Sequence, residues 1–338
     1  TVNIGALSIE DVVAVARYGA QVEIAPAALE EVAATRERVE ELAQDPTPVY
    51  GISTGFGALA RRHIPEEMRA QLQLSLVRSH AAGTGPEVEE EVIRALMLLR
   101  LSTLCTGRTG VRPVVVETYA KALNAGIVPV VREYGSLGCS GDLAPLAHCA
   151  LALLGEGEVR VNGELQDAGE ALAAAGIEPL QLREKEGLAL INGTDGMLGQ
   201  LCLAITDLRA AAKTADIATA MTVEGLLGTL VVFADDLQQL RPHPGQADAA
   251  ANILQVAEGS EILEAALEEF KKNQVQDAYA VRCAPQVAGG FRDTLTHTAQ
   301  VAERELAAAV DNPVVTKDGR VVSNGNFHGA PVAYALDF

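Results

Sequence analysis

Apolar residues recur at three- and four-residue spacing along most of the chain, and this periodicity predicts a helical protein. Strong helix formers with this spacing fill residues 27–44 and 86–104. Further helices are expected over 246–271 and 294–310, with a break at RPHPGQ, residues 241–246. Strand signals are few, so the pattern favours the all-α class with a bundle of long helices.

The longest periodic stretch runs from Thr194 to residue 228 and predicts one long core helix. Alanines and threonines beside its apolar stripe would let a second helix approach closely. The stripe consists of Leu198, Leu201, Ile205 and Leu208.

Two short segments predict β-hairpins on the surface of this helical protein. EVRVNGELQ (158–166) and VVTKDGRVV (314–322) each place Asn-Gly or Asp-Gly between β-prone runs. We therefore expect an N-terminal region over residues 1–190 and a helical bundle over 191–338. Because PVAYALDF ends on an apolar residue without a cap, the natural polypeptide is expected to continue beyond Phe338.

Composition excludes several classes of partner. The 338 residues are 49% hydrophobic and 21% charged, enough apolar content for a sizeable core. A formal net charge of −19 repels phosphate backbones and anionic lipids, so nucleic acid and membranes are not expected partners. The same charge also serves as a simple solubility device.

The five cysteines are widely scattered and include no CxxC pair, which suits neither a disulfide framework nor a zinc site. A reducing cytoplasm is therefore the expected compartment, and no signal peptide or membrane span is recognised. Five of the histidines form no convincing ligand cluster, so no metal is expected. They are His63, His148, His243, His297 and His328.

The segment GSLGCSGDLAPLAH, residues 135–148, carries the candidate chemistry. If the chain bends tightly, the Gly141 nitrogen can attack the Cys139 carbonyl carbon and close a five-membered ring. Glycine permits this because it lacks a Cβ. Loss of one water from the ring and of the Ser140 hydroxyl as a second water leaves a methylidene-imidazolone. This group is a strong electrophile, which no encoded side chain provides.

The surroundings suit this chemistry, although an ordinary turn with a Ser cap has the same short sequence. Gly135 and Gly138 loosen the approach. Residues 142–145 predict the first turn of a helix, where Pro145 is tolerated and where the helix presents partial positive charge. Fluorescent-protein chromophores cyclise similarly, but inside a closed β-barrel, and this chain is helical.

The segment resembles the signature of the aromatic amino acid ammonia-lyases, whose electrophile, 4-methylideneimidazole-5-one (MIO), forms from Ala-Ser-Gly. Cys139 replaces the usual Ala, and its side chain stays outside the ring. The resemblance extends over essentially the whole chain through five further motifs. They are YGISTGFG (50–57), SLVRSHAAGTG (75–85), LALING (188–193), VQDAYAVRC (275–283) and SNGNFHGAPVA (323–333).

The resemblance implies an ammonia-lyase, and SHAAG at residues 79–83 resembles the members that act on histidine. The implied reaction converts L-histidine to trans-urocanate and ammonia. His80 would then face the substrate imidazole, whereas a lone histidine on a helix is otherwise a satisfied core or surface residue. Lyases or aminomutases for phenylalanine or tyrosine are the alternative within the family.

The resemblance also implies a role for each candidate site residue. Ser140 would supply the methylidene and Tyr50 the base, which needs a local field that favours phenolate. Arg282 suits the substrate carboxylate, because a guanidinium makes a planar paired contact, although a buried structural pair is the other interpretation. The remaining roles are an amide to the ring oxygen, an amide to the carboxylate, a second tyrosine near the electrophile and an apolar wall. They fall to Asn192, Gln276, Tyr279 and Phe327, each of which is otherwise an ordinary cap, turn or packing residue.

Assembly and length set the remaining expectations. Family members are homotetramers whose active sites draw residues from three subunits, so a homo-oligomer is implied. Relatives are longer, and a glutamate in their C-terminal part contacts the substrate; relatives often have another Glu where this chain has Ala330. A catalytically incompetent helical fragment is therefore a third hypothesis.

Overall fold

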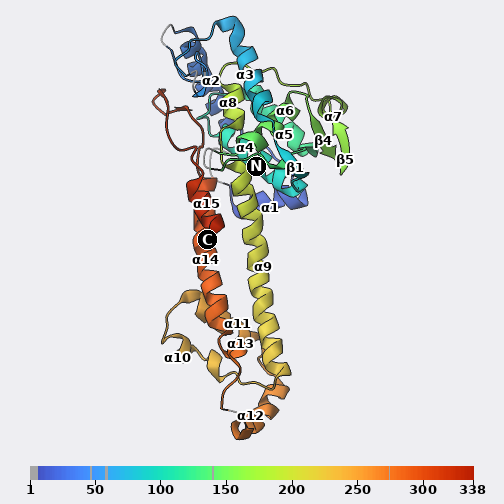
Figure 1. Ribbon diagram of the computed structural model, residues 1–338, viewed down its shortest axis with the longest axis vertical. Helices are drawn as coiled ribbons and strands as arrows, with labels where there is room; N and C mark the ends of the chain where they lie inside the picture. The colour runs from blue at the N-terminus through green and yellow to red at the C-terminus, as the bar shows by residue number, and fades with distance from the viewer. Residues whose placement is uncertain (1–6, 46–47, 58–59, 139–140, 274) are drawn as a thin grey trace. The chain divides into compact units, whose positions relative to one another are not determined.

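The computed structural model describes residues 7–338 apart from 46–47, 58–59, 139–140 and 274 (Figure 1). The chain divides into two compact units. The first contains Thr1–Leu203 and Val301–Asp337, and the second contains Ala204–Gln300 and Phe338. This division differs from the sequence-based boundary near residue 190, because the chain after residue 300 returns to the first unit.

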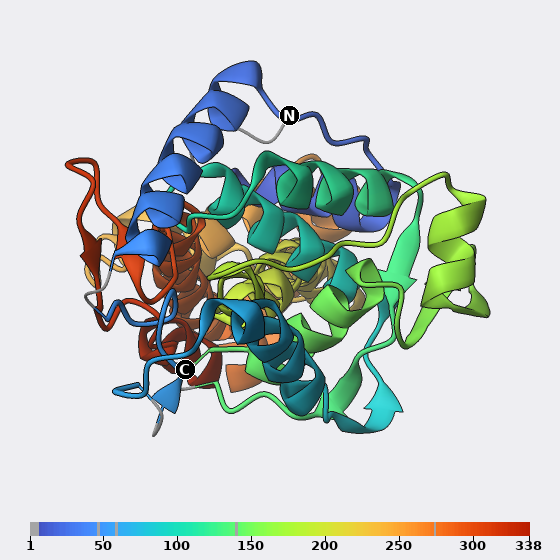
Figure 2. The same ribbon diagram turned by 90° about the horizontal axis from the view of Figure 1, so that it is seen from above.

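Helices dominate the described residues, and the predicted all-α class is confirmed. In the first unit, α4 is buried on almost every face, as expected of a core helix. Figure 2 shows α2 at one margin of this unit and α7 at the opposite margin. The helices of the first unit are α1 (Ile9–Tyr18), α2 (Pro26–Gln44), α3 (Glu66–His80), α4 (Glu90–Cys105), α5 (Pro113–Asn124), α6 (Leu143–Leu153), α7 (Ala168–Ala174), α8 (Glu186–Ile191) and α15 (Ala330–Asp337).

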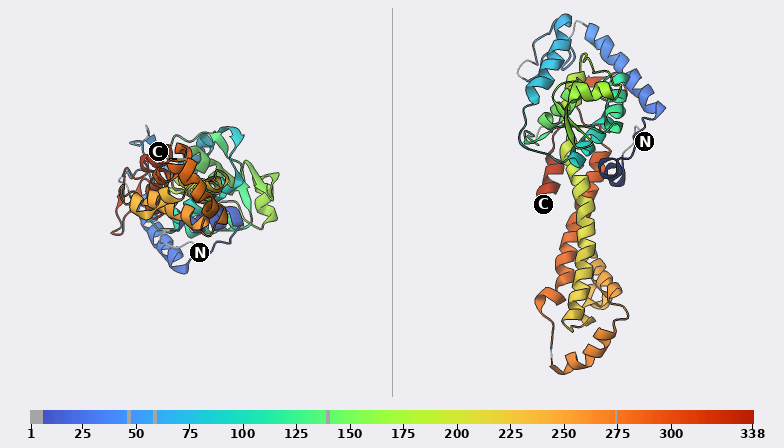
Figure 3. Two further views of the ribbon diagram at one scale, coloured as in Figure 1. Left: turned by 90° about the horizontal axis from the view of Figure 1, so that it is seen from below. Right: turned by 90° about the vertical axis from the view of Figure 1, so that its right-hand side faces the viewer.

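Helix α9 (Asp195–Gly225) begins in the first unit and continues into the second. Within the second unit it lies beside α14 (Figures 1 and 3), and Arg292 of α14 donates to the carbonyl of Ala212 at 3.1 Å. An apolar cluster that includes Phe233, Ile253 and Val281 forms the core of this unit. Its other helices are the 3-10 helix η2 (Val231–Phe233), α10 (Asp235–Gln238), α11 (Pro244–Val256), α12 (Glu261–Asn273), α13 (Tyr279–Arg282) and α14 (Ala284–Leu306).

Both predicted hairpins are confirmed, and the described strands form three small antiparallel sheets. Asn162 and Gly163 both adopt positive φ in the first hairpin, as a tight two-residue turn requires. One sheet pairs β1 (Thr84–Glu87) with β3 (Arg132–Tyr134), and another pairs β6 (Val314–Val315) with β7 (Val321–Val322). In the three-stranded sheet, β4 (Glu158–Val161) is central and pairs with β2 (Ile127–Pro129) and with β5 (Glu164–Asp167).

Four predictions about the helices need correction in detail. The helix expected over 294–310 begins ten residues earlier, at Ala284, and ends at Leu306. The helix expected over 86–104 begins at Glu90, because residues 84–87 pair with β3. The helix expected over 246–271 is two helices, separated at Gly259, whose φ is +74°. Leu208 was expected on the buried stripe of α9 but is 40% exposed, whereas Leu198, Leu201 and Ile205 are buried.

The helical stretch from Glu186 to Gly225 is long and apolar enough to cross a membrane, as judged by length and hydropathy. However, 83% of its most apolar window is buried inside the protein, which is typical of a core helix. This finding is consistent with the core role that the sequence predicts for residues 194–228 and is weak evidence for a membrane span.

Candidate active site

A cleft of about 340 Å³ in the first unit brings four of the predicted site residues together: Tyr50, His80, Asn192 and Phe327. These residues come from four segments far apart in the sequence. The rest of the lining is mainly apolar, and it includes Leu143, the first residue of α6. The remaining lining residues are Phe56, Gly57, Leu76, Leu188, Ile191 and Asn312.

Tyr50 lies in a tight turn that precedes the isolated bridge at Thr54. The amides of Ile52 and Ser53 both donate to the carbonyl of Val49, which closes the turn around Tyr50. Gly51 adopts a φ of +75°, a conformation that favours glycine. The Tyr50 ring meets Phe56 edge-on, with centroids 6.4 Å apart.

His80 is the last residue of α3, and its ring is fixed by the preceding turn of the helix. Its Nδ1 lies 2.9 Å from the carbonyl oxygen of Leu76 and 3.1 Å from the Ser79 hydroxyl. Since a carbonyl only accepts, Nδ1 donates to Leu76, and a neutral ring keeps Nε2 as an acceptor. The helix end therefore presents a ring nitrogen able to accept a hydrogen bond.

The predicted helix start after the Cys-Ser-Gly segment is confirmed, because α6 begins at Leu143. Asp142 precedes it and is buried; its amide donates to the Gly193 carbonyl at 2.6 Å. Its carboxylate accepts from the Ser136 hydroxyl at 2.7 Å and the Met197 amide at 2.9 Å. Burial raises the pKa of Asp142, and these hydrogen bonds oppose the rise.

Cys139 and Ser140 lie outside the described residues, and the residues on either side of them hold the two ends of the segment close together, as the uncyclised precursor requires. The Gly141 amide donates to the Gly138 carbonyl at 3.2 Å, a hydrogen bond that is lost when the Gly141 nitrogen enters the ring. Gly141 has a φ of +89°, and a Cβ there would lie 2.5 Å from the Gly193 oxygen. A Cβ on Gly329 would collide with the Gly138 oxygen. Backbone therefore approaches from both sides so closely that only glycine fits.

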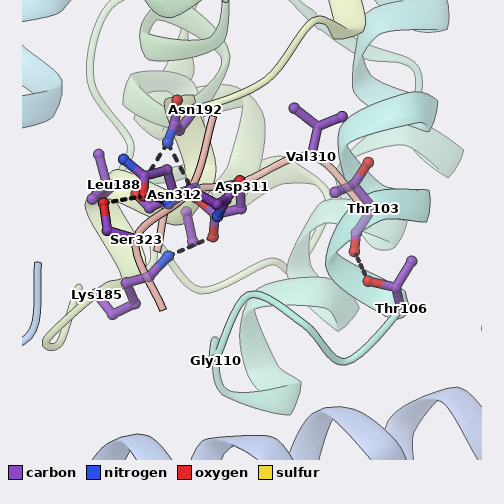
Figure 4. A network of polar contacts seen from close by, with 12 residues as sticks. Thr103, Thr106, Gly110, Lys185, Leu188, Asn192, Val310, Asp311, Asn312 and Ser323 are labelled. Atoms are coloured by element: carbon purple, nitrogen blue, oxygen red, sulfur yellow. Dashed lines mark hydrogen bonds and ion pairs between the residues drawn. The ribbon is translucent and has the colours of Figure 1, made fainter. Parts of the chain in front are cut away.

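Asn192 follows α8, and its side-chain amide turns toward the segment 311–312 (Figure 4). Nδ2 donates to the Asn312 carbonyl at 3.1 Å and lies 3.4 Å from Asp311 Oδ1. Asp311 is fully buried and forms an ion pair with the equally buried Lys185. The peptide bond between Asn312 and Pro313 is cis.

Arg100, on α4, is fully buried and holds the same two segments together. Its Nη1 donates to the carbonyls of Ala189 and Asn192, at 3.1 and 2.9 Å. Its Nη2 donates to the carbonyl of Val310 at 3.1 Å. One guanidinium therefore fixes the backbone on both sides of the Asn192 contact.

Asp195 is the buried partner of this guanidinium, with its Oδ2 3.3 Å from Arg100 Nη2. Burial raises the pKa of Asp195 to about 6, the Arg100 charge opposes this rise, and the charge of Asp142 adds to it. Arg100 is therefore the charge that compensates the buried Asp195, whereas the buried Asp142 is stabilised first by hydrogen bonds from Met197 and Ser136.

Gln276, Tyr279 and Arg282 belong to the second unit and form a group of their own. The Arg282 guanidinium stacks over the Tyr279 ring at 4.5 Å from its centroid and donates to Gln276 Oε1. Tyr279 is 72% exposed. The roles suggested for these three residues stay predictions.

The sequence motifs did not single out Asn312, which lines the cleft, or the buried residues Arg100, Lys185 and Asp311 behind the Asn192 contact. Asn312 stands next to the residues taken only as a hairpin, and nothing in its local pattern marks a site. No group of three His, Cys, Asp or Glu side chains among the described residues could hold a metal ion.

The sequence matches the family of aromatic amino acid lyases over residues 7–338, and the chain belongs to this family. It is 62% identical to a protein named histidine ammonia-lyase from Streptomyces coelicolor. The alignment spans 338 residues, which are 100% of this chain and 66% of that relative. A protein of the same name from Streptomyces griseus is 63% identical over 330 residues, 97% of this chain and 64% of the relative. The chain thus spans slightly less than two thirds of the length of these relatives.

Solved structures agree with this assignment. Tyrosine aminomutase from Streptomyces globisporus superposes with a TM-score of 0.92 at 39% sequence identity. The superposition covers 99% of this chain and 66% of the aminomutase chain. Histidine ammonia-lyase from Trypanosoma cruzi gives a TM-score of 0.89 at 38% identity, with 99% and 62% covered. The fold is therefore that of the aromatic lyases and aminomutases.

Proposed function

We propose that the protein eliminates ammonia from L-histidine to give trans-urocanate, with MIO formed from Cys139, Ser140 and Gly141 as its electrophile. The observation that carries this proposal is the cleft, which places Tyr50, His80 and Asn192 beside the start of the helix that follows the tripeptide. The high identity to proteins named histidine ammonia-lyase supports the reaction class.

When formed, MIO supplies an electron-poor carbon that converts the substrate amine into a leaving group. Residues that would hold it are the glycines whose backbone closely approaches the segment, Gly193 and Gly329, and the carboxamide of Asn192. Asp142 ties the same loop to α9 through the Met197 amide, and this contact keeps the loop against the cleft.

Within the cleft, Tyr50 would remove the β-proton of the substrate as general base. The turn that closes on Val49 fixes its position relative to Phe56. His80 would accept a hydrogen bond from the substrate imidazole at Nε2, since Nδ1 is occupied by Leu76. Phe327 would close the cleft with an apolar wall against the imidazole.

We further propose that Arg282 binds the substrate carboxylate with help from Gln276, and that Tyr279 acts as the second tyrosine. Their mutual contacts support a common task, because the guanidinium is oriented by both the amide and the ring. The proposal includes a homotetramer, as the resemblance implies, in the reducing cytoplasm that the scattered cysteines favour.

A second candidate is a lyase or aminomutase for tyrosine or phenylalanine, and the similarity to tyrosine aminomutase favours it. His80 argues against phenylalanine, because a ring nitrogen acceptor suits an imidazole N–H or a phenol O–H better than an apolar phenyl ring. The 62–63% identity to proteins named histidine ammonia-lyase, against 39% to tyrosine aminomutase, favours histidine over tyrosine. Absorbance separates the candidates: urocanate, coumarate or cinnamate accumulates when histidine, tyrosine or phenylalanine is offered.

Intact mass tests the cofactor directly. The wild-type chain should weigh two water molecules less than its sequence, and Ser140→Ala should not lose the second water. Ser75→Ala, an exposed hydroxyl on α3 that accepts from Gln71 at 3.2 Å, is the matched control and should mature like wild type. A wild-type chain of full mass that still forms urocanate would contradict the mechanism. A full-mass chain without activity would support the hypothesis of an incompetent fragment.

A further inference from the structure

The ion pair between Lys185 and Asp311 is the most deeply buried pair of charges among the described residues. Both side chains are fully buried, and they join a residue just before α8 to the segment that leads into β6. Burial lowers the pKa of Lys185, and the Asp311 charge opposes this change. Because such a pair is costly to bury, its retention calls for a role beyond packing.

Lys185 is also held in an unusual backbone conformation. Its φ is +72°, in the left-handed region that a residue with a long side chain rarely adopts. Its side chain lies next to the turn of Tyr50, since a Cβ on Gly51 would lie 3.1 Å from Leu188 Cδ2, 3.3 Å from Pro313 Cδ and 3.8 Å from Lys185 Cδ. Lys185 and the segment that follows Asp311 are therefore neighbours of this turn, together with Leu188 of α8.

Asp311 divides its two oxygens between Lys185 and the cleft wall (Figure 4). Oδ2 pairs with Lys185, while Oδ1 accepts from the Asn312 amide at 2.7 Å and lies 3.4 Å from Asn192 Nδ2. The Asn312 side chain in turn accepts from Ser323 at 3.0 Å, ahead of the segment that carries Phe327. Asn192 and Asn312 both line the cleft, whereas Lys185 and Asp311 do not.

We infer that Lys185 and Asp311 are positioning residues, which orient the Asn192 carboxamide and fix the position of the Tyr50 turn in the cleft. This inference rests on the proposed function, since it concerns the same site. The pair acts through its neighbours: the Asp311 carboxylate attracts the amide donors, and the lysine stem supports Gly51. A misplacement of about 1 Å in such groups costs on the order of 100-fold in rate.

Double variants separate this role from simple charge balance. Either single change leaves a buried charge unpaired and is expected to lower the melting temperature. Lys185→Met/Asp311→Asn and Lys185→Met/Asp311→Leu both remove both charges, but only the first keeps an oxygen that can accept from Asn192 and Asn312. Thermal unfolding identifies the folded variants.

With L-histidine, we expect the Leu double variant to lose about 10- to 100-fold in kcat while KM changes less than about threefold. The Asn double variant should retain several-fold more kcat at a similar melting temperature. The side-chain amide signal of Asn192, assigned by its loss in Asn192→Ser, should exchange faster with solvent in the Leu double variant than in wild type. This NMR measurement does not depend on activity.

A matched control lies in the second unit, where Asp216 pairs with Arg292 and accepts from Asn252 Nδ2 at 2.7 Å. Arg292→Met/Asp216→Leu should leave kcat and the Asn192 signal unchanged. Three results would each overturn the inference. The folded Leu double variant could keep the kcat of wild type, both double variants could lose kcat equally, or the control variant could lose as much kcat as the Leu double variant. A wild-type chain that keeps full mass and forms no urocanate contradicts the proposed function instead, and the Asn192 signal then still decides the positioning role.

Discussion

The two units hold their candidate site residues in different ways. In the first unit, Asn192 stands at the end of a helix and Tyr50 on a turn, and buried charges fix the backbone around them. In the second, Tyr279 and Arg282 lie on the four-residue helix α13, whose one buried side chain is Val281. Buried polar contacts can fix irregular backbone where apolar packing alone leaves donors and acceptors unpaired.

The support of α13 is correspondingly simple. Val281 packs into the apolar cluster that contains Phe233 and Ile253. Just before the helix, the buried carboxylate of Asp277 accepts from the Thr229 amide at 2.9 Å. The comparison therefore predicts that the backbone around Tyr50 and Asn192 is sensitive to loss of buried charge, and that α13 is sensitive to loss of apolar volume.

The largest effect is expected from Arg100→Met. This change removes three hydrogen bonds to buried carbonyls and leaves the buried Asp195 without its cation. The free energy of unfolding should fall by about 3–5 kcal/mol, measured by urea denaturation. The exposed Arg320→Met, which breaks a surface pair with Asp318, should leave the midpoint unchanged. Similar midpoints for the two variants would contradict the importance of the buried charge.

Much of the fold could be predicted because its signals are local. The periodicity of residues 27–44 and the Asn-Gly turn at 162–163 depend only on near neighbours, and both predictions are confirmed. The prediction that a helix begins at residue 86 was wrong, because residues 84–87 pair with β3, which lies more than 40 residues away in the sequence. The split of 246–271 has a local signal in Gly259, because glycine favours the positive φ that ends the first of the two helices.

The candidate site was predictable only as a set of residues. Motifs marked Tyr50, His80, Asn192 and Phe327, but their convergence on one cleft arises from tertiary structure. Lys185 stands in a charged stretch, REKE, where a solvent-exposed side chain would be the ordinary expectation. Its burial depends on Asp311, 126 residues further along the chain, and no local pattern indicates such a pair.

A smaller effect is expected from Val281→Ala in the second unit. The side chain is 4% exposed, and loss of two methyl groups should lower the free energy of unfolding by about 1.5–3 kcal/mol. Val287→Ala is the matched control, because Val287 is 75% exposed and its truncation should have almost no effect. Denaturation monitored by circular dichroism measures both, and equal values would show that the apolar anchor of α13 is not needed.

The smallest effect expected is a change in the pH dependence of stability, and it concerns His148. This residue of α6 connects the helix to the segment after His80. Its Nε2 accepts from the Gly83 amide at 3.1 Å, which requires an unprotonated nitrogen. Burial lowers the pKa of His148, and the Arg132 charge lowers it further. Because the unfolded chain then binds a proton at higher pH than the native protein, stability is lost as pH falls below about 6.5 toward the lowered value.

His148→Gln should flatten this pH dependence, because an amide oxygen can still accept from Gly83 but does not titrate. Melting temperatures between about pH 8 and pH 5.5 measure the slope. His297→Gln, at an exposed position on α14 in the second unit, should leave the slope unchanged. If both glutamine variants lose stability in parallel with wild type on acidification, protonation of His148 does not break the Gly83 contact. Other groups of the first unit must then account for the loss of stability in acid.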